Sequence, residues 1–387
     1  TFMQTPVLYQ IALGRLHPEE PDLAGVQIAY PWFAHVFWAV NSWVSRTGPT
    51  MVDALANLIA LASVAACIIR MSRSLSARAF GASAALVWMA LGTNALGVGI
   101  QMLSGWLPGD PRYSPWLRKF TTFETSPAAL PLVAGMLLVA TPASVRTDRS
   151  LLRLTGVFML ACAAMYPVML PACVGVGVGL AWAQWTVRDQ DKPPLPRYVE
   201  TLLWTVGAVV VGGIFTWLFA GASTGHLAML SKAPAIVSKT GSAVVALAPL
   251  MIGAALCQWR LGFRPERRVL LAAGGASVAA FVAFQLTGGY LEYKLMFPAA
   301  MAMAPLAAPA LEPWVRKRST EFIVVAASML LLVPVWFIAK NPTERRPAVA
   351  SAPLVLDDSP WLRFAGPQPA LDWITNVQQT APADARR

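Results

Sequence analysis

The sequence predicts an all-α integral membrane protein, and three observations support this fold class. Hydrophobic residues make up 56% of the 387 residues, whereas charged residues make up only 13%; soluble domains contain about a quarter charged residues. The mean hydropathy is +0.55. Many segments are apolar over about 20 residues, the length that crosses the hydrocarbon core as a helix. A soluble protein would have to bury all of them in one core, so we expect a bundle of membrane-spanning helices.

Residues 1–51 form the first expected region, a loop with two helices that lie on the membrane surface. Residues 1–14 are too polar to span and predict an interfacial helix. Residues 28–44 are apolar but contain three tryptophans, which favour the headgroup level. An acidic loop separates the two helices, and its carboxylates are Glu19, Glu20 and Asp22. The alternative is that residues 28–44 span the membrane, which would move the acidic loop to the cytoplasmic side.

Residues 52–339 form the second region, with about ten expected spans. These are 52–69, 79–98, 125–141, 151–166, 168–186, 199–220, 242–259, 269–287, 295–311 and 321–339. Prolines interrupt the apolar run between the fourth and fifth of them; the alternative is one long kinked helix there. We also expect one more span upstream of Thr1, with an Asp or Glu near the junction, because the chain starts without a methionine or a signal peptide.

The charge distribution predicts the orientation of the bundle. The net charge is +11, and the basic residues collect in every second loop: sixteen lie on one side and six in the opposite loops between spans. Lys and Arg favour the cytoplasmic side of a membrane protein, so the first side is expected to be cytoplasmic. The charge is then explained by topology, and we expect no nucleic-acid partner. The polar, proline-rich tail, residues 340–387, is expected on the outer side as the start of a soluble domain.

Candidate catalytic groups are carboxylates on the outer side. Glu20 and Asp22 of the acidic loop are candidates for a general base or a metal ligand near the membrane surface, with Glu19 beside them. The alternative is that they are ordinary solvated loop residues. Glu124 is a sharper candidate, because it is the one acid where a span begins. The alternative for Glu124 is a structural role, since a helix N-terminus favours an anion.

Candidate phosphate-binding cations also lie on the outer side, against the charge bias. Phosphate needs fixed positive charge where it leaves water, and the candidates are Lys294, Arg112, Arg118 and Lys119. Glu292, Tyr30, His35 and His226 are candidate substrate-binding residues. The alternatives are a snorkelling interfacial pair for Glu292 and Lys294 and ordinary interfacial histidines for His35 and His226. The four cysteines have no metal-ligand spacing, so neither a structural metal site nor a disulfide framework is predicted.

Four segments in this order resemble the GT-C superfamily of membrane glycosyltransferases. The segment QIALGRLHPEEPDLAGVQIAYPWFAH is similar to the first outer loop of that superfamily, with its juxtamembrane helices. The segment RKFTTFETSPAALPL resembles the entry from the second loop to a span in bacterial members. The segments GGYLEYKLMFPAAMAMAPLA and LDWITNVQQTAPADA resemble the late Glu-x-Lys segment and the helix that opens the periplasmic domain.

This resemblance implies a GT-C-like bundle in the bacterial inner membrane that uses a polyprenyl-phosphate or -diphosphate sugar donor on the periplasmic side. The acceptor is a periplasmic molecule or a lipid. In the superfamily a first-loop aspartate acts as the base, so Glu19, Glu20 or Asp22, or an acid upstream of Thr1, would have that role; the alternative is that the chain is inactive. Glu124 would be the second acid, Lys294 and Arg112 would hold donor phosphate, and a divalent cation, Mg²⁺ or Mn²⁺, is a candidate cofactor. Membrane lipid and an oligomer or larger complex are candidate partners. The alternative functions are a transporter or flippase of lipid-linked intermediates, and a non-catalytic subunit of a membrane complex.

Overall fold

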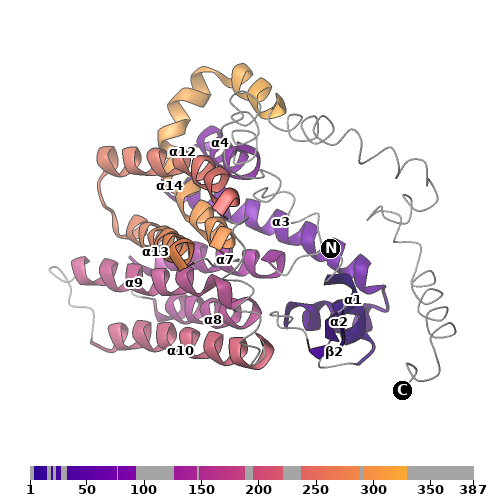
Figure 1. Ribbon diagram of the computed structural model, residues 1–387. Coiled ribbons are helices and arrows are strands. Elements are labelled where there is room, and N and C mark those ends of the chain that lie inside the picture. Colours follow the sequence, from indigo (N-terminus) through magenta and orange to yellow (C-terminus); the bar gives the residue numbers. More distant parts are fainter. Residues whose placement is uncertain are drawn as a thin grey trace, which may run out of the picture.

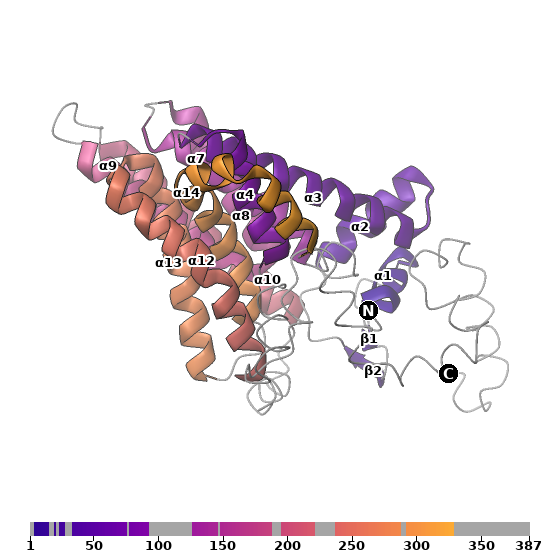
Figure 2. The same cartoon turned by 90° about the horizontal axis from the view of Figure 1, so that it is seen from above.

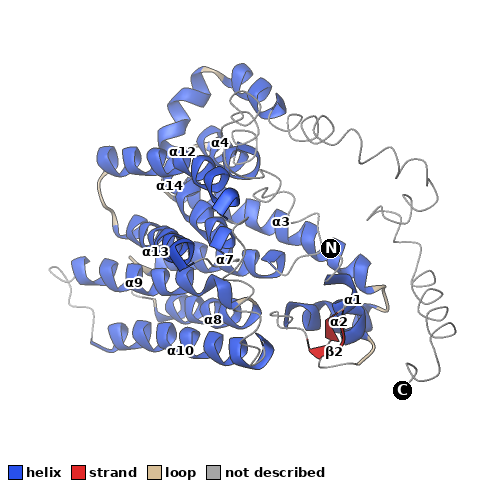
Figure 3. Ribbon diagram, viewed as in Figure 1, coloured by secondary structure: helices blue, strands red, loops and turns tan. Residues whose placement is uncertain are grey.

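The computed structural model describes ten stretches of the chain, which are almost entirely helical (Figures 1 and 3). These are residues 4–14, 19–20, 23–27, 33–75, 77–92, 126–145, 148–187, 195–220, 237–287 and 292–328. The all-helical fold class expected for the bundle is therefore observed in these stretches, with one small exception in the first loop.

A small unit of helices and strands, which we call the surface unit because it lies at the side of the bundle, precedes the bundle. It contains α1 (Gln4–Ala12), β1 (Glu19–Glu20), β2 (Leu23–Gln27) and α2 (Phe33–Ser45). The two short strands pair antiparallel, where the sequence suggested only a loop. Figures 1 and 2 place this unit beside the N-terminal end of α3, away from α9 and α13.

The surface unit has its own apolar core. Val7, Leu8 and Ile11 of α1 pack against Ala34 and Trp38 of α2. The indole Nε1 of Trp43 donates a hydrogen bond of 2.7 Å to the carbonyl oxygen of Ala12, which joins the ends of the two helices. Both helices are too short to cross a membrane, at about 1.5 Å per residue, and their position on a membrane surface stays a prediction.

The first half of the bundle follows the predicted spans closely. Its elements are α3 (Pro49–Ser74), α4 (Ala79–Val87), the π-helical turn η1 (Trp88–Gly92), α7 (Ser126–Ala143), α8 (Arg149–Met165), the 3₁₀ turn η3 (Pro167–Met169), α9 (Leu170–Val187) and α10 (Leu195–Ala220). Only the first part of the expected span 79–98 can be compared, because residues 93–98 lie outside the described residues.

The chain reverses between α8 and α9, which decides between the two alternatives for this segment. Cys173 Sγ lies 3.8 Å from the carbonyl oxygen of Met159, although one continuous helix would separate these residues by about 21 Å. The break falls at Tyr166, whose backbone is extended at φ −154° and ψ 91°. Pro167 disfavours helical backbone in the residue before it, so the hairpin prediction is confirmed.

The second half contains α12 (Val237–Leu261), α13 (Pro265–Thr287), the 3₁₀ turn η5 (Glu292–Leu295), α14 (Met296–Lys317) and a last described helix, Ser319–Ser328. Small residues allow the closest packing. A Cβ on Gly175 of α9 would lie 2.6 Å from the carbonyl oxygen of Ala272 of α13, and one on Gly179 would lie 2.6 Å from the Cα of Val269. This Gly-xxx-Gly spacing lets two helix backbones approach closely, as membrane helices commonly do.

Three helical segments in the described part of the chain are both long and apolar enough to cross a membrane. They are Leu55–Ser74, Pro167–Trp185 and Arg197–Leu218. Shorter apolar helices are Ala79–Leu91, Ala128–Ala143, Leu247–Leu261 and Ser319–Ser328. The third of the long segments is mostly uncovered by protein, with 17% of it buried, as a lipid-facing helix requires. The chain is thus a helical protein with segments suited to a membrane, while the number of ten spans stays a prediction.

Candidate functional site at the lysine end of the bundle

Lys294 of η5 is buried at one end of the bundle. Only 3% of its surface is exposed. Its Nζ donates a hydrogen bond of 2.5 Å to the hydroxyl of Tyr166 and lies 5.1 Å from the centroid of the same ring. Tyr166 is fully buried. We call the end of the bundle that holds this pair the lysine end.

Local sequence explains why these two residues, 128 positions apart, meet. Tyr166 lies at the tip of the α8–α9 hairpin, because Pro167 ends α8 there. Lys294 lies where the chain returns from α13 into α14, so it is also at a helix connection. Connections with an even number of helices between them fall at the same end of an up-and-down bundle. The apolar residues after Lys294 (Leu295, Met296 and Phe297) are buried and anchor the turn.

The surface unit covers the same end. The apolar core of α1 and α2 continues onto Met165, the neighbour of Tyr166, and onto Ala128 in the first turn of α7. Phe33 at the start of α2 packs edge-on against Phe215 near the end of α10, with ring centroids 5.0 Å apart. The helices α1 and α2, the first turn of α7 and the turn η5 therefore lie at one end of the bundle.

The chemistry of the Lys294–Tyr166 pair suits an anionic ligand. Removing an ammonium from water is costly, and a neutral hydroxyl solvates the charge without neutralising it. The pair therefore fixes a positive charge inside the protein, and a phosphate group would complement that charge.

The predicted site residues are only partly within the described residues. His35 of α2 is buried at 1% exposure and packs edge-on against Trp38, with ring centroids 5.3 Å apart. Glu20 lies in β1, and Glu292 begins η5 two positions before Lys294. Glu124, Asp22, Arg112, Arg118, Lys119, Tyr30 and His226 lie outside the described residues. The structure thus fixes the surroundings of Lys294 and of His35, and the roles of all these residues stay predictions.

Tyr166 is the residue that sequence reasoning missed. The segment YPVMLP was interpreted only as a helix break. The one signal in the sequence is a single tyrosine between two predicted spans, on the predicted outer side. Its partner Lys294 is 128 positions away, so the pairing itself leaves no local pattern.

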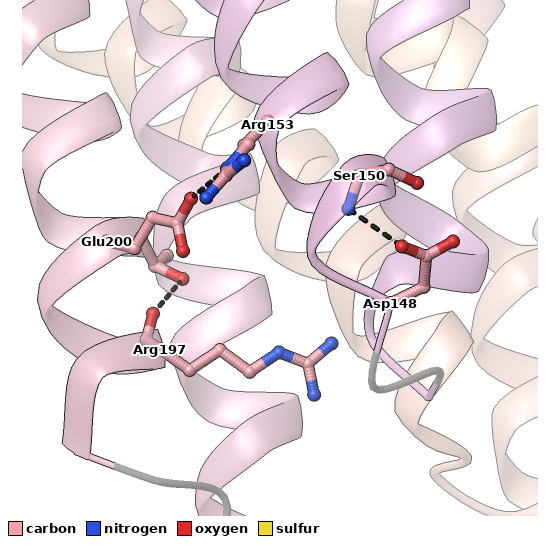
Figure 4. Close-up of polar contacts among 6 residues, drawn as sticks. Asp148, Ser150, Arg153, Arg197 and Glu200 are labelled. Carbon is pink, nitrogen blue, oxygen red and sulfur yellow. Dashed lines mark hydrogen bonds and ion pairs between the residues drawn. The ribbon is translucent and has the colours of Figure 1, made fainter.

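A second polar cluster, at the opposite end, has a structural role (Figure 4). Arg153 Nε of α8 lies 3.2 Å from Glu200 Oε1 of α10. Asp148 caps α8 by accepting a hydrogen bond of 2.8 Å from the backbone nitrogen of Ser150. Arg197 is buried and donates from Nη2 to the carbonyl oxygen of Ala143, which ends α7, at 3.1 Å. Cations stabilise helix C-termini in this way.

Further contacts bring the other basic connections to that opposite end, which we call the arginine-rich end. The guanidinium of Arg268, at the start of α13, lies over the ring of Trp182, near the end of α9. The backbone nitrogen of Gly81, in the first turn of α4, donates to the carboxylate of Glu312 near the end of α14. The described basic residues of this end are Arg70, Arg73, Arg78, Arg149, Arg153, Arg197, Arg260, Arg264, Arg267, Arg268, Arg316, Lys317 and Arg318.

Among the described residues, no group of three or more His, Cys, Asp or Glu side chains is arranged to hold a metal ion. Of the predicted catalytic acids, Glu124 and Asp22 lie outside the described residues. No known family model matches the chain, and comparison with characterised proteins and with solved structures gives no significant match either. The function is therefore inferred from the geometry of the lysine end and from the sequence.

Proposed function

We propose that this protein is a membrane glycosyltransferase that moves a sugar from a polyprenyl-phosphate or -diphosphate donor to a periplasmic or lipid acceptor. The observation that carries the proposal is the buried Lys294 ammonium bound to Tyr166, at the end of the bundle covered by α1 and α2. A fixed cation beside interfacial helices suits a phosphate whose isoprenoid chain stays in the bilayer.

In this proposal Lys294 binds the donor phosphate, with Arg112, Arg118 and Lys119 as further cations. Tyr166 is a positioning residue that holds the lysine side chain in place. As the bond between sugar C1 and the phosphate oxygen breaks, negative charge grows on the leaving phosphate. A preorganised ammonium stabilises that charge more than it stabilises the ground state.

In this proposal a carboxylate activates the acceptor. Glu124, Asp22 or Glu20 takes the proton of the acceptor hydroxyl, whose oxygen forms the new bond to C1. Carboxylates are also the ligands preferred by Mg²⁺, so these acids would hold a divalent cation if the reaction uses one. Such a cation would help to neutralise the phosphate charge.

We assign the lysine end to the periplasmic side of a bacterial inner membrane. The support is the collection of basic residues at the other end, because Lys and Arg favour the cytoplasm. The acidic loop and the tail 340–387 would then also be periplasmic.

The test is sugar transfer by the purified protein in liposomes that contain a radiolabelled polyprenyl-phosphate sugar, with extracted envelope lipid as acceptor. Wild-type protein should transfer label. Glu124→Gln and Lys294→Gln should abolish transfer while the amount of folded protein is unchanged. Glu321→Gln is the matched control, since Glu321 is exposed and follows the basic end of α14; it should keep full activity.

Three outcomes would overturn the proposal. Full transfer activity in both Glu124→Gln and Lys294→Gln would show that these residues do not form the catalytic site. Movement of a fluorescent lipid-linked sugar across the bilayer without any transfer would instead identify a flippase. A wild-type protein that neither transfers nor moves the donor, but co-purifies with a second enzyme that does, would identify a non-catalytic subunit.

A further inference from the structure

A second candidate site lies at the arginine-rich end, where the turn between α12 and α13 closes over the end of α9. Gly262 ends α12 with φ +73°, in the left-handed region that favours glycine. Its backbone nitrogen donates to the carbonyl oxygen of Gln258 at 2.9 Å, and Arg267 Nη1 donates to the carbonyl oxygen of Gly262 at 3.0 Å. These hydrogen bonds fix the conformation of the turn, which places two consecutive arginines, Arg267 and Arg268, at the start of α13.

Both arginines have buried N–H groups without a hydrogen-bond partner among the described residues. Arg267 is 1% exposed, and its Nε has no partner. The guanidinium of Arg268 lies 5.3 Å from the ring centroid of Trp182, while its Nε and Nη1 have no partner. Buried N–H groups in folded proteins are nearly always paired. Two adjacent guanidinium groups with unused donors indicate a missing acceptor.

Aromatic side chains around the turn indicate the depth of these arginines in a membrane. Trp182 and Phe263 lie together, with ring centroids 6.4 Å apart. Trp185 near the end of α9 is 64% exposed, and Trp259 near the end of α12 is 86% exposed. Exposed tryptophans on membrane helices favour the headgroup level. The unused donors therefore lie close to the phosphates of one leaflet.

The charge around the turn also favours an anion. Arg260 and Arg264 of the same turn are exposed, and Glu266 is the one acid in the first turn of α13. Residues 260–268 thus contain four arginines and one glutamate. The N-terminus of α13 adds its partial positive charge. Four cations against one carboxylate leave a clear positive excess.

We propose that this turn binds the headgroup phosphate of an anionic phospholipid, such as phosphatidylglycerol, in the leaflet at the arginine-rich end. Arg268, which is half-buried, reaches the phosphate by rotating its long side chain off Trp182, and Arg267 holds the turn and adds charge beneath it. Trp185 and Trp259 lie at the headgroup level, next to the point where the acyl chains of this lipid begin. This site is independent of the proposed glycosyl transfer, because it lies at the other end of the bundle.

The test uses the full chain in a mild zwitterionic detergent, with phosphatidylglycerol and phosphatidylcholine of identical acyl chains as probes. Native mass spectrometry measures the lipid that stays bound, and thermal unfolding measures protection. Wild-type protein should retain phosphatidylglycerol in preference to phosphatidylcholine. Arg268→Gln should weaken phosphatidylglycerol binding about fivefold, the effect expected for one basic residue at a lipid surface.

Matched variants separate a specific site from general positive charge. Arg70→Gln removes an exposed arginine of the same end and should leave binding unchanged. Arg268→Lys keeps the charge but loses the planar guanidinium that binds phosphate through two parallel hydrogen bonds, and should weaken binding less than Arg268→Gln. If Arg267→Gln does not fold, because Arg267 is buried, Arg268→Gln and Arg268→Lys still test the site.

Three results would overturn the proposal. Equal retention of both lipids would show that no anion site exists. A loss of phosphatidylglycerol binding in Arg70→Gln equal to that in Arg268→Gln would show that the lipid preference is non-specific attraction to positive charge. Protection by millimolar inorganic phosphate that matches phosphatidylglycerol would identify a site for free phosphate rather than a lipid. None of these measurements depends on transfer activity.

Discussion

The two ends of the bundle each bury a cation, but they bind it differently. At the arginine-rich end Arg197 donates to the carbonyl oxygen that ends α7, a group that carries the partial negative charge of a helix C-terminus. At the lysine end Lys294 donates to the hydroxyl of Tyr166, a neutral group. The first arrangement joins a cation to a helix end, whereas the second joins a cation to a phenol, and under the proposed function that cation binds the donor phosphate. Four substitutions test this difference.

The largest effect is expected for Lys294→Met. Loss of a preorganised charge at a leaving group typically lowers the rate about 10²- to 10³-fold. The free energy of unfolding should fall by no more than about 1–3 kcal/mol, the cost of leaving the buried Tyr166 hydroxyl without this donor, and the removal of a buried charge offsets part of that cost. Transfer rate per folded protein and the unfolding temperature in detergent measure the two quantities. A large loss of stability would instead assign Lys294 a structural role.

Arg197→Met should give the opposite result. The carbonyl oxygen of Ala143 would lose its donor, and an unsatisfied buried polar group costs about 1–3 kcal/mol. We expect a lower unfolding temperature and less folded protein, with normal activity in the protein that remains folded. Detergent-solubilised yield and activity per folded molecule check this. An activity loss without a stability loss would contradict the comparison.

Tyr166→Phe should have a smaller effect on activity, about tenfold. The substitution keeps the ring under the ammonium but removes the hydrogen bond, which contributes roughly 1.5 kcal/mol or more when one partner is charged. The dependence of the rate on donor concentration distinguishes positioning from bulk packing: we expect a higher KM for the donor with a modest fall in kcat. An unchanged KM with a lower unfolding temperature would indicate packing alone.

The smallest effect is expected for Arg153→Gln. The Arg153 side chain is 64% exposed, and surface ion pairs contribute about 0–1 kcal/mol. Unfolding temperature and transfer rate should both stay close to wild type. A large change in either would mean that Arg153 does more than pair with Glu200.

Local patterns in the sequence predicted the helices well. Hydropathy and length placed α3 and α10 within a few residues, because a segment that must meet lipid is apolar along its whole length. Proline placed the break at Tyr166, because its effect on the preceding residue is local. The sequence did not predict the small strand pair, because strands of two and five residues are too short to show a clear alternation of apolar and polar side chains.

Pairings between distant segments could not be predicted in the same way. The carboxylate of Glu312 accepts a hydrogen bond from Gly81 in the first turn of α4, where α4 has no side-chain cap of its own. Nothing near either residue indicates the other. The same holds for Lys294 and Tyr166, of which only the lysine was a candidate, because an outer cation departs from the charge bias.

The sequence by itself determined that this protein is helical, suited to a membrane, and more basic on one side than on the other. Each of these properties follows from the average polarity of short segments, which the solvent around them imposes. Only the tertiary structure decided which helix connections meet, which cation is buried on a phenol and which on a helix end. Those contacts depend on close packing at small residues such as Gly175 and Gly179, and packing geometry is a property of two segments together.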